Sequence, residues 1–192
     1  MCSSPPPEQF TEKNLPDLSG YVAIVTGGNS GIGYETCKQL ALKNARVYVS
    51  GRSRERVDQA IQKMRDETGS NLDLRFLQLD LTDLRSVTSA ADTFMRTESR
   101  LDLLFNNAGV MNVPMSYTAD GYETQWQVNY LAPFVFVSKL LPIMLHTAST
   151  SARMDRVRII NITSDMALNL GARHIHYDDV NMASQKGILA PL

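Results

Sequence analysis

The sequence predicts an α/β protein built on a doubly wound parallel sheet. Three observations predict this class. Short apolar, β-branched segments alternate with segments of helical periodicity, the first strand–helix pair is joined by a glycine-rich turn, and 192 residues suffice for one domain with a sizeable core. Because a helical crossover between two strands is almost always right-handed and makes the strands parallel, we expect a parallel sheet.

The bulk composition argues against several function classes. The net charge of −1 provides no basic field for phosphates, so we expect no nucleic-acid partner. The two cysteines, Cys2 and Cys37, form neither a metal-binding spacing nor a disulfide framework. The sequence shows no signal peptide and no apolar run of membrane-spanning length, so we expect a cytoplasmic protein without a membrane partner.

The chain begins with a polar, proline-containing stretch, residues 1–15, that is typical of a disordered tail. We assign residues 18–192 to one domain. Residues 21–25 are apolar and β-branched and predict the first strand, whereas residues 34–43 carry apolar and small residues at helical spacing. Asn44 is expected to end this helix.

Three glycines, Gly27, Gly31 and Gly33, lie in the turn between that strand and that helix. The turn needs residues without Cβ, and a diphosphate group needs close approach to the backbone N–H groups of a helix N-terminus. This placement predicts nucleotide binding, with a plain glycine-rich turn as the alternative.

Arginines crowd the end of the second predicted strand, residues 45–50. In dinucleotide-binding folds an acidic residue at this place accepts the 2′-hydroxyl of NAD, whereas arginine accommodates the 2′-phosphate of NADP. Arg52, Arg54 and Arg56 follow the strand, and no acidic residue ends it. We therefore expect NADP, bound by Arg52 or Arg54. The alternative is that the three arginines only solvate the helix predicted over residues 55–67.

Two further strands are followed by polar residues. Residues 72–79 alternate and predict the third strand, after which Asp80 can accept a hydrogen bond from an adenine amino group or cap the next helix. Residues 101–105 predict the fourth strand, which runs into Asn-Asn-Ala-Gly at residues 106–109. These small and amide residues let the chain pass close to a ligand and tie down neighbouring strand ends.

A long apolar helix is predicted over residues 122–146 and contains Pro133. Proline has no N–H to donate to the carbonyl four residues earlier, which here belongs to Asn129, and this costs a helix ~3 kcal/mol. We therefore expect a kink at Pro133 that leaves the Asn129 carbonyl free to bind water or another group. Residues 156–163 predict the fifth strand, and Ser164 stands at its end. The expected strand order is 3-2-1-4-5.

The pattern Thr-Gly-x-x-x-Gly-x-Gly at residues 26–33, together with Asn-Asn-Ala-Gly at residues 106–109, resembles the short-chain dehydrogenase/reductase family. The resemblance covers about residues 18–181 and implies a Rossmann-type fold, with five strands present of the family's usual seven. It also implies hydride transfer between a nicotinamide cofactor and a carbonyl or alcohol. The candidate cofactor-binding residues are Gly27, Ser30, Gly31, Ile32, Gly33, Arg52, Arg54, Asp80, Leu81, Asn106, Ala108, Gly109 and Lys139.

The resemblance implies catalytic roles for two residues. In this family a serine at the place of Ser164 hydrogen-bonds the substrate carbonyl oxygen, whereas a serine that ends a strand is otherwise a turn residue. An asparagine at the place of Asn129 holds a water of the proton relay through its backbone carbonyl. Lys139 matches a position that can approach the cofactor in relatives, and a solvated lysine is the alternative.

This sequence departs from the family's pattern at the catalytic acid. In the family the acid is a tyrosine, and a lysine four residues later lowers the pKa of that tyrosine. No such pair follows Ser164, because Tyr177 is followed four residues later by Asn181. Residues 173–181 resemble a loop of the retinol-dehydrogenase-like branch, in which the catalytic tyrosine comes later. Tyr177 is therefore a doubtful acid, and we expect the chain to be truncated, with a C-terminally incomplete domain.

These observations favour an NADP-dependent oxidoreductase that interconverts a carbonyl and an alcohol of a small-molecule substrate. The alternatives are a catalytically inactive NADP-binding pseudoenzyme or truncated gene product, and a binding module that pairs with a full-length relative. No further strand is predicted to pair with residues 157–162, and the long helix would lack a neighbour, so we expect a tendency to form homo-oligomers.

Overall fold

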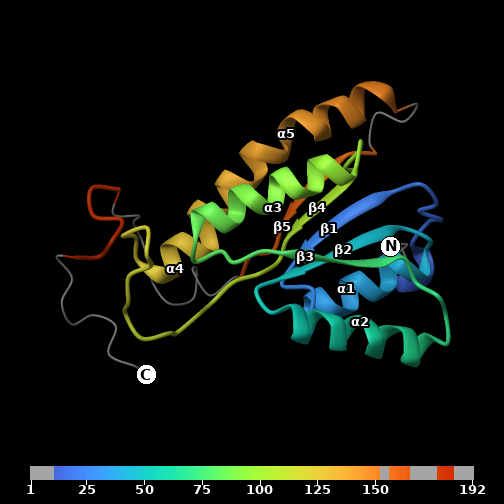
Figure 1. Ribbon diagram of the computed structural model, residues 1–192, viewed down its shortest axis with the longest axis horizontal. Coiled ribbons are helices and arrows are strands. Elements are labelled where there is room, and N and C mark those ends of the chain that lie inside the picture. The colour runs from blue at the N-terminus through green and yellow to red at the C-terminus, as the bar shows by residue number, and fades with distance from the viewer. Residues whose placement is uncertain (1–10, 152–155, 165–176, 184–192) are drawn as a thin grey trace, which may run out of the picture.

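Five parallel strands form one sheet in the computed structural model, which describes residues 11–151, 156–164 and 177–183 (Figure 1). The strands are β1 (Val22–Thr26), β2 (Arg46–Gly51), β3 (Leu74–Gln78), β4 (Leu103–Asn106) and β5 (Arg158–Asn161). Their order is β3-β2-β1-β4-β5, so the predicted order is confirmed. The order reverses between β1 and β4, and ligands bind in the crevice at the carboxyl ends of strands at such a point.

Helices cover both faces of the sheet. On one face lie α1 (Gly31–Leu42) and α2 (Arg54–Thr68), and on the other lie α3 (Leu84–Thr97) and α5 (Ala132–Thr150) (Figure 1). Met64 packs with Val25 in the core beneath the first pair, whereas Phe94 and Phe136 pack in the core beneath the second. The predicted doubly wound α/β class is therefore confirmed.

Ahead of β1 the chain makes one 3-10 turn, η1 (Glu12–Asn14), before it reaches the core. Leu18 is the first buried residue among those described, and its N–H donates to the Lys43 carbonyl at 2.7 Å. Asn44 follows α1 with a left-handed φ of 70°, in agreement with the predicted helix end. Residues 1–10 of the predicted tail lie outside the described residues.

The long helix is continuous but not regular. It comprises α4 (Thr124–Trp126), a π-helical turn η2 (Gln127–Leu131) and α5. In η2 the N–H of Ala132 donates to the Gln127 carbonyl, five residues back. Pro133 is the second residue of α5, and the sequence predicted a kink there. The structure has a π-helical turn just before this proline, one of the known ways a helix accommodates an interrupted ladder of hydrogen bonds.

This helix corrects one expectation drawn from the sequence. Residues 124–150 form a helix long and apolar enough to cross a membrane by length and composition, although no such run was expected. Phe136 and Leu140 of this helix are fully buried, whereas only 28% of its most apolar stretch is buried in the structure. Its outer side exposes Phe134 and Leu145, which are 59% and 61% accessible.

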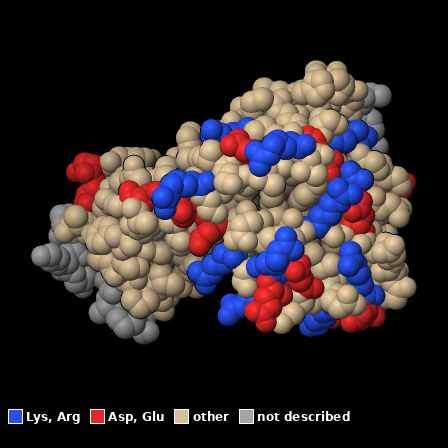
Figure 2. Space-filling model, in the orientation of Figure 1, with Lys and Arg blue, Asp and Glu red and all other residues tan. Residues whose placement is uncertain are grey.

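The β5 edge of the sheet pairs with no further strand among the described residues. Ile159 and Ile162 on and beside this strand are 39% and 44% exposed. On the face that Figure 2 shows, acidic and basic side chains lie close to one another where charges occur. Exposed apolar side chains on a strand favour association between chains, and the homo-oligomer stays a prediction.

Candidate functional site

The glycine turn brings the end of β1 against the segment that follows β4. Gly27 has a φ of +66°, a conformation that favours glycine. A Cβ on Gly33 would lie 2.5 Å from the Gly27 carbonyl oxygen and 2.5 Å from Nδ2 of Asn107. Only glycine fits at position 33, because the first atom is backbone of the turn and the second is held by its hydrogen bond to the Thr26 carbonyl.

Thr26 and Asn107 fasten the two strand ends together. The Thr26 hydroxyl accepts hydrogen bonds from the N–H groups of Asn107 and Ala108, each at 2.9 Å, and Nδ2 of Asn107 donates to the Thr26 carbonyl at 2.8 Å. Our sequence interpretation expected amides to tie strand ends together but did not single out Asn107. Its position directly after a buried strand was the available signal.

Asn106 connects the end of β4 to the end of β5, on the other side of β4. Its Nδ2 donates to Oδ1 of Asn161 at the end of β5, at 2.8 Å, and its carbonyl accepts the Ile162 N–H at 3.0 Å. Ser164 lies two residues further along and is exposed. The β4–β5 pairing therefore carries Ser164 to the same edge of the sheet as the glycine turn.

A cavity of about 290 Å³ opens at this edge of the sheet. Its walls come from the glycine turn and the segments that follow β2, β3 and β4. The lining residues are Thr26, Gly27, Asn29, Ser30, Ser50, Gly51, Arg52, Ser53, Arg56, Leu79, Asp80, Leu81, Thr82, Ala108, Gly109, Val110 and Val128. Seven of the predicted cofactor-binding residues line the cavity, and all but Arg52 lie on turns after β1, β3 or β4: Gly27, Ser30, Arg52, Asp80, Leu81, Ala108 and Gly109.

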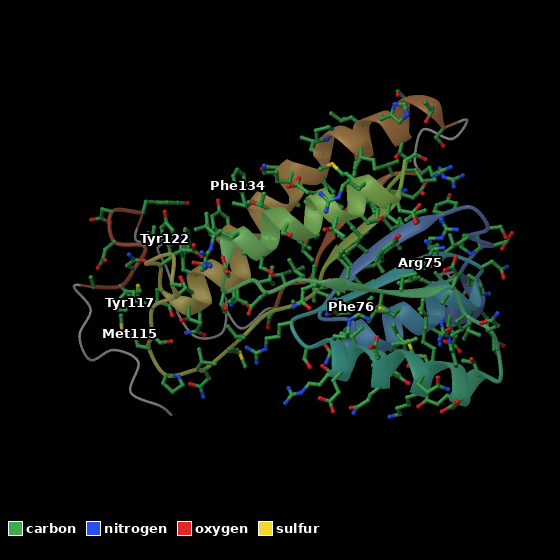
Figure 3. The ribbon with its side chains drawn as sticks, in the orientation of Figure 1. Arg75, Phe76, Met115, Tyr117, Tyr122 and Phe134 are labelled. Atoms are coloured by element: carbon green, nitrogen blue, oxygen red, sulfur yellow. The ribbon has the colours of Figure 1, made fainter. Side chains whose placement is uncertain are left out.

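The three arginines after β2 point in different directions. Arg52 and Arg56 line the cavity, but Arg54 does not. The Arg54 guanidinium stacks over the Phe76 ring at 4.5 Å from its centroid and pairs with Asp58 at 3.6 Å (Phe76 is labelled in Figure 3). The structure thus favours Arg56 in the place for which the sequence suggested Arg54.

Asp80 lines the cavity with one carboxylate oxygen already engaged. Its Oδ1 accepts the Thr82 N–H at 2.9 Å and the Thr82 hydroxyl at 2.7 Å. The helix cap itself is Asp83, which accepts the Arg85 N–H at 2.9 Å. Asp80 is therefore not the cap of α3, and its second oxygen remains the candidate acceptor for an adenine amino group.

Asn129 lies in η2 and holds the loop after β4. Its Nδ2 donates to the Val110 carbonyl and its Oδ1 accepts the Val110 N–H, both at 2.8 Å. Gly109 permits this approach, since a Cβ there would lie 3.2 Å from the Asn129 amide oxygen. The side chain is thus engaged with Val110, so the predicted role in a water relay would fall to the backbone carbonyl of Asn129.

Five other candidate cofactor-binding residues are not among those that line the cavity. Gly31 and Ile32 lie in the glycine turn, where Ile32 is 68% exposed, and Gly33 and Asn106 form the packed floor. Lys139 is exposed on α5 and is not among the lining residues. Solvation is the simpler account of this lysine.

Tyr177 is also not brought to the cavity. It is 78% exposed and absent from the lining. Asn181 accepts the Glu123 N–H at 2.9 Å with its side-chain oxygen and donates to the Gly121 carbonyl at 3.2 Å. These bonds anchor residues 177–183 on the loop before α4 rather than beside Ser164 or Asn129.

Comparison with known proteins shows the family of this chain. The family model for short chain dehydrogenase matches residues 21–184. An uncharacterized oxidoreductase of Schizosaccharomyces pombe is 42% identical over 174 residues, which are 91% of this chain and 51% of the yeast protein. Human retinol dehydrogenase 11 is 40% identical over 159 residues, 83% of this chain and 47% of the human protein.

A solved structure is also similar to this chain. The active-site complex of Pseudomonas aeruginosa RhlG with NADP is 30% identical, with a TM-score of 0.64 over 77% of this chain and 56% of RhlG. The chain spans about half the length of the curated relatives it matches. Since the family model covers most of the chain and the strand order agrees, the chain belongs to the short-chain dehydrogenase family.

Proposed function

We propose that this chain binds NADP and serves the hydride transfer of a short-chain oxidoreductase, which interconverts a carbonyl and an alcohol of a small-molecule substrate. The observation that carries the proposal is the cavity at the carboxyl ends of the strands. It combines the glycine turn at the start of α1 with Arg52 and Arg56. The NADP complex of the similar RhlG supports the choice of nucleotide.

The lining residues fit a dinucleotide. The N–H groups at the start of α1 suit a diphosphate, because Gly27 and Gly33 keep side chains out of the turn. Guanidinium groups such as Arg52 and Arg56 make charge-assisted hydrogen bonds to a phosphate. When bound, the nicotinamide supplies or accepts the hydride. Ser164 is proposed to donate a hydrogen bond to the substrate oxygen, and the Asn129 carbonyl to hold a relay water.

The nucleotide preference can be tested with the three arginines. We expect NADPH to bind more tightly than NADH by about 1–3 kcal/mol, the worth of a charge-assisted phosphate contact. Arg52→Ala and Arg56→Ala should each remove part of this preference. Arg54→Ala is the matched control, because Arg54 is occupied with Phe76 and Asp58 and should leave both affinities unchanged.

Fluorescence titration of the wild type and the three variants with both nucleotides measures these effects. Equal affinities for NADPH and NADH in the wild type would refute the proposed phosphate site. A larger loss from Arg54→Ala than from Arg56→Ala would show that the arginines are arranged differently when the nucleotide binds.

One observation favours a second candidate, nucleotide binding without turnover. The tyrosine that precedes Asn181 by four residues lies in solvent, and Asn181 supplies no cation to lower a tyrosine pKa. We therefore expect the 192-residue protein to reduce general carbonyl substrates at rates near background. Tyr177→Phe should leave even this residual rate unchanged.

NADPH oxidation followed at several substrate concentrations tests this expectation. Clear turnover that Tyr177→Phe abolishes would make Tyr177 the acid and refute the second candidate. Turnover that depends on Ser164 but survives Tyr177→Phe would instead point to a different acid.

A further inference from the structure

A glutamine in η2 is buried without belonging to the cavity. Gln127 has no exposed surface, which is unusual for a long polar side chain. It is not one of the residues that line the cavity. The nucleotide site as described so far therefore does not explain why an amide is buried here.

The Gln127 amide is hydrogen-bonded at both ends. Its Nε2 donates to the Leu81 carbonyl at 3.2 Å and to Oδ2 of Asp120 at 2.8 Å. Its Oε1 accepts a hydrogen bond from the Thr118 hydroxyl at 2.6 Å. A buried polar group with its partners satisfied holds those partners in fixed positions.

These partners come from separate parts of the fold. Leu81 follows β3, whereas Thr118 and Asp120 belong to the loop before α4. Oδ2 of Asp120 also accepts the N–H of Leu84, the first residue of α3, at 2.9 Å. The carboxylate thus stands at a helix N-terminus, where a negative charge is favourable, and the loop is fastened to the start of α3.

Two walls of the cavity meet at this amide. Leu81 lines the cavity and is bonded to Gln127 through its carbonyl, and Val128 lines it and is the next residue along the chain. Asn129, which holds the loop at Val110, lies one residue further in the same π-helical turn. A displacement of the Gln127 side chain would therefore move the wall formed by Leu81 relative to η2.

We infer that Gln127 is a positioning residue that sets the spacing between the Leu81 wall and η2 and thereby controls nucleotide affinity. The inference rests on the proposed nucleotide site. Gln127 contacts no ligand itself. It acts through Leu81 and through the loop that carries Asp120.

Gln127→Glu gives a sharp test because it keeps the size of the side chain. It places a second carboxylate beside Asp120, with Glu123 in the same loop and Arg85 at the start of α3 as the other charged groups around it. Neighbouring carboxylates raise the pKa of one of the pair. At alkaline pH the donor to Leu81 is lost and the charges repel, whereas protonation at acid pH restores a donor.

The experiment is a calorimetric titration with NADP⁺ at pH 8 and at pH 5.5, each variant compared with the wild type at the same pH. We expect Gln127→Glu to bind about tenfold more weakly at pH 8 and to recover to within about threefold at pH 5.5. Trp126, the single tryptophan, adjoins Gln127, so its fluorescence response to saturating NADP⁺ should also shrink at pH 8.

Gln125→Glu is the matched control. It introduces the same charge two residues away, but the Gln125 amide oxygen accepts the Asn112 N–H at 3.1 Å and does not contact Leu81. Its affinity for NADP⁺ should equal that of the wild type at both pH values. Equal losses in the two variants would overturn the inference.

Urea unfolding separates positioning from mere stability. A destabilised Gln127→Glu protein whose folded fraction binds NADP⁺ as the wild type does would overturn the inference. If Gln127→Glu does not fold, Thr118→Val decides, because it removes one donor to Gln127 at a half-buried residue of a largely exposed loop. It should weaken binding about threefold, and an unchanged Kd would overturn the inference. A wild-type protein that binds no nucleotide would refute the proposed function itself.

Discussion

Replacing Asp102 with alanine is expected to lower the free energy of unfolding by about 3 kcal/mol. Asp102 is fully buried at the start of β4. Its carboxylate accepts hydrogen bonds from Arg100 at 2.8 and 2.9 Å, from the Val22 N–H at 2.9 Å and from Nε of Arg156. It therefore joins β1 to β4 and to the segment that enters β5.

The size of this effect depends on the arginine charges that the substitution leaves unpaired. Removing one partner of a buried ion pair typically costs about 3–5 kcal/mol because the other charge stays unpaired. Arg100 and Arg156 keep 36% and 18% of their side-chain surface, so they regain some hydration and the lower end of the range applies. Arg156 also stacks on Tyr21, at 3.9 Å from the ring centroid, which limits its movement.

The stabilisation by Asp102 should depend on pH. Burial alone would raise the pKa of this carboxyl, but the hydrogen bonds from Arg100, the Val22 N–H and Arg156 together lower it below its ordinary value of 3.8. A carboxyl whose pKa is lower in the folded protein stabilises the fold at pH values above its unfolded pKa. The contribution is lost as the pH falls through the folded pKa.

Urea unfolding at pH 7 and at pH 3 measures both effects. The exposed pair of Asp58 with Arg54, at 3.6 Å, supplies the control, since Asp58→Ala should cost less than about 1 kcal/mol. The difference between Asp102→Asn and the wild type should be smaller at pH 3 than at pH 7. Similar losses in Asp102→Ala and Asp58→Ala would show that the buried carboxylate does not hold the strands together.

Substituting Gly33 with alanine is expected to abolish most nucleotide binding. The new Cβ would lie 2.5 Å from both the Gly27 carbonyl oxygen and Nδ2 of Asn107. Asn107 cannot turn away without losing its 2.8 Å bond to the Thr26 carbonyl. Overpacking of this kind costs about 1–3 kcal/mol of stability, and it moves the turn that would approach the diphosphate.

Gly69→Ala is the control for this substitution. Gly69 ends α2 with a φ of +60° and open space around it, so alanine there strains the backbone without touching the cavity. We expect a loss of about 1 kcal/mol in unfolding free energy and an unchanged affinity for NADPH. A Gly33→Ala protein that binds NADPH as tightly as the wild type would exclude the glycine turn from the nucleotide site.

The sheet was predictable because the first strand is an apolar, β-branched run that is buried throughout, whereas the third alternates with a period of two. Each of the five strands lies within its predicted segment or extends one residue beyond it. The glycine turn and Asn-Asn-Ala-Gly were also predictable, since each follows a strand directly. Parallel strands bring their carboxyl ends to one edge, so the position in the chain already implies a common site.

The direction of individual side chains was not predictable. The Arg54 guanidinium stacks on the ring of Phe76 in β3 and so does not line the cavity, whereas Arg56 does. The helix predicted through Pro133 was correct, but the π-helical turn within it and the hydrogen bonds of Asn129 to Val110 were not predicted. These outcomes depend on contacts between residues far apart in the chain.

The amino-acid sequence by itself determined the fold class, the strand order and the edge at which the cavity opens, because these depend on periodicity and on the handedness of crossovers. Only the tertiary structure decided which arginines face the cavity, that Tyr177 stays in solvent and that Gln127 is buried between Leu81 and Asp120. The Gln127 amide and the Leu81 carbonyl are 46 residues apart in the chain. A hydrogen bond over that separation leaves no periodic mark in the sequence, since it depends on how β3, α3 and η2 pack together.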